Sequence, residues 1–85
     1  GRLRQVAANR FYPPEAVEGL ARIATDLATA DANGWIDVRA FRDQSAIGRN
    51  LAIEVLEYFD KLGFTHRSQD GRNIVKPMED IFGKL

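Results

Sequence analysis

The stretch FRDQSAIGRNLAIEVLEYFDKLGFTHR, from Phe41 to Arg67, decides how this chain folds. Apolar residues recur in it every three to four positions, which is the spacing of one buried face on an amphipathic helix. The spacing predicts the end of a short helix, a turn over residues 45–48 and a long helix from about Arg49 to Leu62. Gly63 then follows as a well-placed C-cap. An aromatic run that ends in two basic residues comes next, so we expect a strand from Phe64.

Upstream of this stretch, turn signals separate a longer helix from a short one. A helix from about Pro14 to Ala30 begins at a proline, which suits a first turn because its missing N–H is not needed there. Asn33-Gly34 is a strong turn signal. Residues 35–36 then fit a very short strand, and Asp37 is a good N-cap for a second helix from about Val38 to Gln44.

Downstream, residues 69–71 (Gln-Asp-Gly) separate two short runs, Phe64–Ser68 and Arg72–Lys76. Asp-Gly between two such runs predicts a β-hairpin. We expect residues 1–13 to form an extended lead-in from a preceding domain, and residues 77–85 to form a tail that docks as a short helix. The apolar residues that these two ends offer for packing are Leu3, Val6, Phe11, Met78, Ile81 and Phe82.

The order of elements is helix, short strand, helix, helix, strand, hairpin turn, strand. This order is typical of a winged helix, an α+β fold that is mainly helical, with a three-helix core and a small antiparallel β-hairpin as its wing. We therefore expect residues 1–85 to form a single winged-helix domain, and nothing argues for more than a monomer.

Composition narrows the possible functions. The chain has 85 residues, 45% of them hydrophobic and 28% charged, as in an ordinary globular domain. It has no cysteine and one histidine, His66, so thiolate and histidine-rich metal sites are excluded. We find no phosphate-cradling glycine loop, nucleophile–base pair or metal-ligand spacing, and no apolar run near the roughly 20 residues of a membrane span. We expect no enzyme, cofactor or membrane contact in this chain. It opens abruptly at Gly1 without a secretory leader, as an excised piece of a longer protein would.

The balance of charge limits how the chain binds nucleic acid. Twelve basic and twelve acidic residues give a net charge of zero, whereas a dedicated non-specific DNA binder would be more basic. Contact with a nucleic acid must therefore come from local segregation of charge and from only a few phosphates.

The start of the third helix is the first candidate contact. Arg49 and Asn50 are expected on its exposed first turn, where free backbone N–H groups and the helix dipole attract phosphate. Gly48 lets a backbone approach closely, and Arg42 reaches the same side. The alternative is that the two arginines are solvated charges paired with Asp43 or Glu54.

The hairpin is the second candidate, since basic residues surround its polar tip: His66, Arg67, Arg72 and Lys76. The alternative is that these charges serve solubility alone. For the binding interpretation, the hairpin cations and those at the start of the third helix must converge into one electropositive ledge. Five aromatic residues also suggest base stacking, but their phases place most of them in the core: Trp35, Phe41, Tyr58, Phe59 and Phe64.

Beyond these general patterns, residues 41–67 resemble the last winged-helix repeat of the bacterial selenocysteine-specific elongation factor family, SelB. That family typically shows a phrase of the kind FRD…G(S)RK.A…LEY.D..G.T.R. This chain supplies FRD at 41–43, GR at 48–49, Ala52, LEY at 56–58, Asp60, Gly63, Thr65 and Arg67. The upstream piece RFYPPE at 10–15 also resembles the segment that enters this repeat.

The resemblance implies a cytoplasmic translational GTPase, which uses GTP and Mg²⁺ to deliver selenocysteinyl-tRNA to the ribosome at a recoded UGA codon. The GTPase and tRNA-binding parts are missing here. What carries over is the role of the last repeat, which binds the mRNA hairpin called SECIS. The implied contacts are Arg49 first, then Arg42, Ser45 and Gly48, and more weakly Arg67 and Arg72. Asn50 replaces the family's usual lysine, which removes one cation but leaves an amide that can bond a phosphate or a base edge.

Two other functions stay open at this point. A winged helix of a transcription regulator would read duplex DNA, although Glu54, Glu57 and Asp60 on the third helix oppose deep insertion into a groove. A winged helix that binds another protein would show the zero net charge found here. Recognition of an RNA hairpin would depend on unpaired loop bases, because the A-form major groove is too narrow for a helix.

Overall fold

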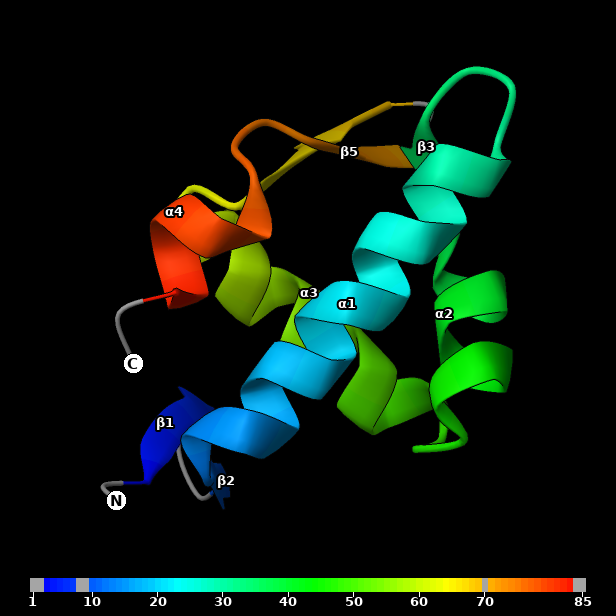
Figure 1. The fold of residues 1–85 in the computed structure, drawn as a ribbon. Coiled ribbons are helices and arrows are strands. Elements are labelled where there is room, and N and C mark those ends of the chain that lie inside the picture. Colours follow the sequence, from blue (N-terminus) through cyan, green and yellow to red (C-terminus); the bar gives the residue numbers. More distant parts are fainter. Residues whose placement is uncertain (1–2, 8–9, 70, 84–85) are drawn as a thin grey trace.

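The computed structural model describes residues 3–7, 10–69 and 71–83. In this part of the chain a bundle of three helices carries a hairpin wing at one end and a second hairpin at the other (Figure 1). The helices are α1 (Pro14–Ala30), α2 (Val38–Ser45), α3 (Arg49–Leu62) and α4 (Met78–Phe82). The strands are β1 (Arg4–Ala7), β2 (Arg10–Tyr12), β3 (Trp35–Ile36), β4 (Thr65–Ser68) and β5 (Gly71–Ile74). The winged-helix prediction is confirmed.

Four phenylalanine rings form the centre of the core. The ring of Phe59, on α3, lies 5.2 Å from that of Phe64, 5.6 Å from that of Phe82 and 6.5 Å from that of Phe41, all edge-on. Edge-on packing is the favoured arrangement because the positive edge of one ring meets the negative face of the next. All four rings are buried. They join α2, α3, the start of the wing and the C-terminal tail, so the predicted docking of that tail as a short helix is confirmed.

Local signals explain where the helices begin and end. The Asp37 carboxylate accepts a hydrogen bond from the Ala40 N–H at 3.4 Å, as a side-chain N-cap does. Gly63 ends α3 with a φ of 78°, in the left-handed region that glycine adopts without a Cβ clash. α2 ends at Ser45, one residue beyond its expected end at Gln44. Its C-cap is Ala46, whose backbone has the left-handed conformation (φ 60°) that ends the helix.

The wing is a three-stranded antiparallel sheet in the order β3-β5-β4. Its register places Ile36 opposite Arg72 and Arg72 opposite Arg67, and the adjacent row is Trp35, Asn73 and His66. Directly opposed residues point to the same face of a sheet. Because Ile36 and Arg72 are buried, the first row faces the helices and the second row faces solvent.

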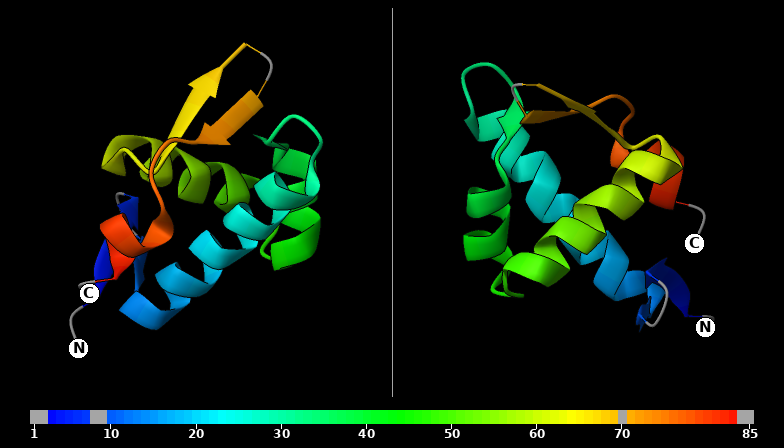
Figure 2. Two further views of the ribbon diagram at one scale, coloured as in Figure 1. Left: turned by 45° about the horizontal axis from the view of Figure 1, so that its top comes forward. Right: turned by 180° about the vertical axis from the view of Figure 1, so that it is seen from behind.

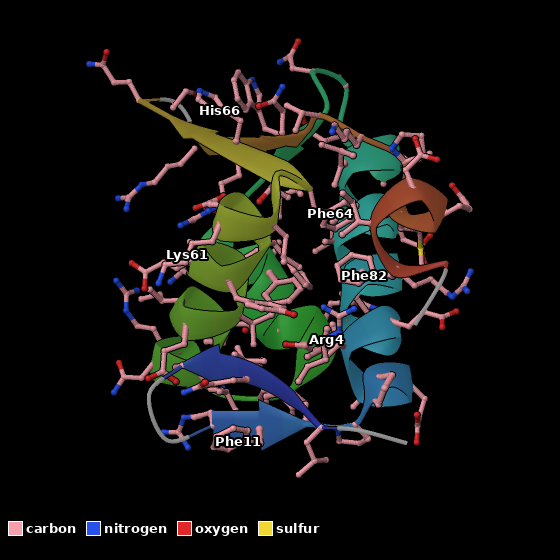
Figure 3. The ribbon with its side chains drawn as sticks, turned by 90° about the vertical axis from the view of Figure 1, so that its left-hand side faces the viewer. Arg4, Phe11, Lys61, Phe64, His66 and Phe82 are labelled. Carbon is pink, nitrogen blue, oxygen red and sulfur yellow. The ribbon has the colours of Figure 1, made fainter. Side chains whose placement is uncertain are left out.

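The N-terminal residues form a hairpin, not a simple extended lead-in. β1 and β2 pair antiparallel, with Arg4 opposite Tyr12 and Gln5 opposite Phe11. Val6 is 7% exposed and packs as expected, whereas Leu3 and Phe11 are 61% and 52% exposed and do not. The alternation along paired strands explains the difference, since Phe11 shares the outer face with Gln5. Phe11 lies at the opposite end of the molecule from His66 of the wing (Figure 3).

Candidate nucleic-acid interface

The third helix presents one polar face to solvent. Arg49, Asn50, Glu57 and Lys61 are exposed on it. The buried residues of α3 face the core: Ala52, Val55, Leu56, Tyr58 and Phe59. Seen from behind, α3 lies in front of α1 and the wing crosses above (Figure 2, right). Lys61 and, further up, His66 of β4 lie on the same side of the molecule (Figure 3). A long ligand laid across this side would therefore meet α3 first and then the wing.

The start of α3 is open to a ligand. Gly48 is its N-cap and offers no side-chain cap, so the backbone N–H groups of residues 49–51 precede the first helical bond, from the Ala52 N–H to the Gly48 carbonyl at 3.0 Å. Arg49 and Asn50 are exposed. Neither side chain bonds to any residue in the described part of the chain. This turn therefore combines free donors, a helix dipole and a free cation, which together suit a phosphate.

Gly48 also has a backbone conformation that favours glycine. Its φ is 85°, in the region that side chains rarely adopt, and a Cβ there would meet nothing within 4 Å. The backbone at Gly48 is therefore uncovered on the side where a Cβ would stand, and the approach of a ligand there stays a prediction.

Arg42 and Ser45, at the end of α2, are already bonded to their neighbours. The Arg42 Nε donates to Asp43 Oδ1 at 3.0 Å, and its side chain is 33% exposed. The Ser45 hydroxyl donates to the Phe41 carbonyl at 2.6 Å. The alternative that Arg42 pairs with Asp43 is the one observed. An exposed pair of this kind contributes only about 0–1 kcal/mol, so Arg42 can exchange its carboxylate for a phosphate at little cost.

Arg72 was expected as an exposed cation of the wing, and that expectation is wrong. The residue is 4% exposed, and its Nε donates to both Asp60 carboxylate oxygens, at 3.0 and 3.2 Å. The Thr65 hydroxyl donates to the same carboxylate at 2.6 Å. The cause is the sheet register, which turns Arg72 toward the helices. The position of Asp60 on α3 suggested a carboxylate exposed to solvent. In the structure this carboxylate accepts hydrogen bonds from Arg72 and Thr65.

The remaining wing cations do not join those of α3 in one ledge. Arg67 is exposed on β4, but β4 follows the far end of a helix of 14 residues, which is about 20 Å long at 1.5 Å per residue. Arg49 and Arg67 therefore lie at opposite ends of the α3 face, and Glu54 and Glu57 lie between them. Arg49 and Arg67 therefore do not form the expected single electropositive surface.

The N-terminal hairpin contributes a cation that the sequence patterns did not indicate. Arg10 Nε donates to Glu54 Oε2 at 2.7 Å, and Arg4 Nη1 donates to the Tyr58 hydroxyl at 3.5 Å. Arg10 therefore neutralises one of the acidic residues on the exposed face of α3. Residues 4–6 (Arg-Gln-Val) and 10–12 (Arg-Phe-Tyr) do not alternate between polar and apolar types, so no local pattern indicated this hairpin.

The aromatic residues divide as their phases predicted. Phe41, Phe59 and Phe64 are fully buried and Tyr58 is nearly so, whereas Trp35 stays partly exposed. Among the described residues, no three His, Asp or Glu side chains gather as metal ligands. Over the same ranges, no helix has the length and apolar character needed to span a bilayer.

The three-helix bundle, the β3-β5-β4 wing and the open start of α3 make this chain a winged-helix domain. The profile of the family described as "Elongation factor SelB, winged helix" matches residues 28–74. The chain belongs to this family, the selenocysteine-specific elongation factor SelB. The predicted family is confirmed, and the place of this domain as the last repeat stays a prediction.

Proteins of two bacteria are similar in sequence to this chain. The selenocysteine-specific elongation factor of Escherichia coli (strain K12) is 36% identical over 67 residues, which cover 79% of this chain and 11% of that protein. The selenocysteine-specific elongation factor of Haemophilus influenzae is 33% identical over 67 residues, which cover 79% of this chain and 10% of that protein. The chain thus spans about a tenth of the length of these relatives.

A solved structure shows the same fold. It is the mRNA-binding domain of elongation factor SelB from E. coli in complex with SECIS RNA, and it is similar to this chain with a TM-score of 0.80 and 32% sequence identity. The similarity covers 87% of this chain and 60% of that chain.

Proposed function

We propose that this domain binds an mRNA hairpin of the SECIS type and holds its translation factor near a recoded UGA codon. The observation that carries the proposal is that Arg49, which bonds to no described residue, lies at a helix start that has no side-chain cap. The similarity to an E. coli SelB domain in complex with SECIS RNA supports it. The full-length protein would then be the GTP-dependent cytoplasmic factor that also binds selenocysteinyl-tRNA and the ribosome.

The charges on α3 favour a hairpin over duplex DNA. Glu57 is exposed on the middle of the helix, and Glu54 is paired with Arg10. A helix inserted into a DNA major groove would bring Glu57 close to the phosphates, and Glu57 forms no ion pair with any described residue. A hairpin loop needs contact only at the start of the helix, because its backbone curves away and its unpaired bases supply the specificity.

The same arrangement explains how a chain of zero net charge can bind RNA. Arg49 and the first-turn N–H groups suit one phosphate, and Arg42 is placed to contact a second after releasing Asp43. Two phosphate contacts give a shallow dependence of affinity on salt, with a slope of about −0.7 for each phosphate on a single strand.

A titration with matched nucleic acids tests the proposal. The ligands are the E. coli SECIS RNA, a hairpin enriched from a pool with randomised loops, each of these with its loop sequence scrambled, and a random DNA duplex. We expect at least one unscrambled hairpin to bind about ten-fold or more tightly than its scrambled form and the DNA. Equal weak affinity for every ligand would refute the proposal, and a preference for duplex DNA would favour a transcription regulator.

A further inference from the structure

The N-terminal hairpin of β1 and β2 places an arginine against the polar face of α3. Arg10 Nε donates to Glu54 Oε2 at 2.7 Å, across 44 positions of sequence. Two further contacts attach the hairpin: Val6 is buried in the core, and Arg4 Nη1 donates to the Tyr58 hydroxyl at 3.5 Å. Arg10 therefore has a defined place beside α3.

The ion pair uses only one edge of the Arg10 guanidinium. A guanidinium has five N–H donors, and Glu54 accepts from the one on Nε. Neither Nη nitrogen donates to a residue in the described part of the chain, and 49% of the Arg10 side chain is exposed. The Nη groups can therefore bind a phosphate while Nε stays bonded to Glu54, because a guanidinium presents its donors as a planar fork.

Arg10 is held one helical turn beyond the start of α3. Glu54 follows Asn50 by four positions, so these two side chains are neighbours on one face of the helix. One turn is about 5.4 Å along the axis. A nucleic-acid backbone that contacts Arg49 and the first-turn N–H groups therefore brings another phosphate of the same strand close to Arg10.

The N-terminal segment is also a place where basic residues are separated from acidic ones. Residues 1–14 contain three arginines and no aspartate or glutamate, whereas the whole chain has twelve basic and twelve acidic residues. Such local segregation is what allows a chain of zero net charge to bind nucleic acid. A phosphate that approaches β2 therefore meets positive charge, with Glu54 already paired.

We infer that Arg10 is a further RNA-binding residue of this domain. Its Nη groups bind a backbone phosphate near the one at the start of α3, and Glu54 is the positioning residue that holds the guanidinium there. The inference rests on the proposed function, since the same RNA hairpin contacts both places. It extends the interface from α3 to the N-terminal hairpin, whose Phe11 lies at the opposite end of the molecule from His66 of the wing (Figure 3).

Paired substitutions separate a phosphate contact from simple neutralisation of Glu54. Arg10→Gln alone leaves the carboxylate unpaired, so it should weaken binding of the enriched hairpin under either explanation. Arg10→Gln with Glu54→Gln removes both charges, keeps the local net charge and leaves two amides that can bond to each other. We expect this double variant to bind about five-fold or more less tightly than wild type, because hydrogen bonds from a charged group to a phosphate are lost. Wild-type affinity in the double variant would overturn the inference.

An ion pair of the same residue types on α1 provides the matched control. Arg22 Nη2 lies 3.4 Å from Glu18 Oε1, and both side chains are largely exposed. Arg22→Gln with Glu18→Gln should leave the affinity for the hairpin unchanged. An equal loss of affinity in this control would show that binding responds to any surface pair, which contradicts a specific contact at Arg10.

Neutral phosphates in the RNA locate the contact. A methylphosphonate, next to a methylated sugar hydroxyl for chemical stability, replaces one backbone phosphate at a time. We expect one position to weaken binding of the wild-type domain but not of the Arg10→Gln, Glu54→Gln variant, and a different position to lose its effect in Arg49→Ala. Each comparison is made within one variant, so a uniform loss of stability does not imitate the result. If every position keeps its effect in the double variant, Arg10 contacts no phosphate.

The possible failures are distinguishable. If the hairpin binds the wild-type domain tightly while the double variant binds equally well, Arg10 only neutralises Glu54 and the proposed function stands. If no hairpin binds the wild-type domain, both proposals fall.

Discussion

The guanidinium of Arg72 on β5 joins the carboxylate of Asp60 on α3, with its Nε 3.0 and 3.2 Å from the two oxygens. The Arg72 side chain is 5% exposed and that of Asp60 is 24% exposed. The pair, reinforced by the Thr65 hydroxyl, holds the wing against the third helix. It therefore sets the position of the wing relative to the α3 face.

Breaking this pair should destabilise the domain strongly. Arg72→Ala leaves the Asp60 carboxylate half-buried without its partner, so we expect a loss of about 3–5 kcal/mol in the free energy of unfolding, measured by urea denaturation. Replacing both partners, as Asp60→Leu with Arg72→Met, should restore much of that loss because no unpaired charge remains. Wild-type stability in the Arg72→Ala variant would show that the pair contributes nothing.

The Arg49 side chain should matter for binding and not for stability. Arg49→Ala removes an exposed cation that has no partner among the described residues, so the urea midpoint should stay unchanged. Hairpin affinity should fall about ten-fold or more, because a hydrogen bond to a charged group is lost. The salt slope should fall by about 0.7 if the phosphate is on a single strand. A variant that unfolds more easily, or that binds as well as wild type, contradicts this role.

Restoring a cation at position 50 should strengthen binding. Asn50 is exposed in the first turn of α3, where a lysine can reach the phosphate that approaches the helix start. We expect Asn50→Lys to steepen the salt slope by about 0.7 and to raise affinity at low salt. Asn50→Gln, which adds length without charge, is the control. If the lysine variant binds less tightly, the Asn50 amide itself bonds the RNA.

Two exposed or half-exposed glycines should respond in opposite directions to alanine. Gly63→Ala places a Cβ at a φ of 78° and should cost about 1–2 kcal/mol. Gly19 lies inside α1, where a Cβ would meet nothing within 4 Å, so Gly19→Ala should stabilise by about 0.4–1 kcal/mol. Thermal unfolding of the two variants under one set of conditions measures both effects. Equal shifts of the midpoint would exclude the backbone explanation.

Much of the fold was predictable because its signals are local. The spacing of apolar residues placed α1 and α3, and Asn33-Gly34, Asp37 and Gly63 placed turns and caps within one or two residues. These signals act through backbone conformation and through a single buried face. The exposure of Arg49 and Asn50 followed from the same helical phase.

The sequence by itself thus determined the helices and wing strands of this winged helix, their order and the open start of its third helix, but not the pairing of β1 with β2. Tertiary structure alone decided that Arg72 is buried on Asp60, that Arg10 reaches Glu54 across 44 positions of sequence, and that Arg67 stays apart from Arg49. The physical reason is that helix and turn preferences act over a few residues. Strand register and the packing of hairpins on α3, in contrast, depend on contacts between segments far apart in the chain.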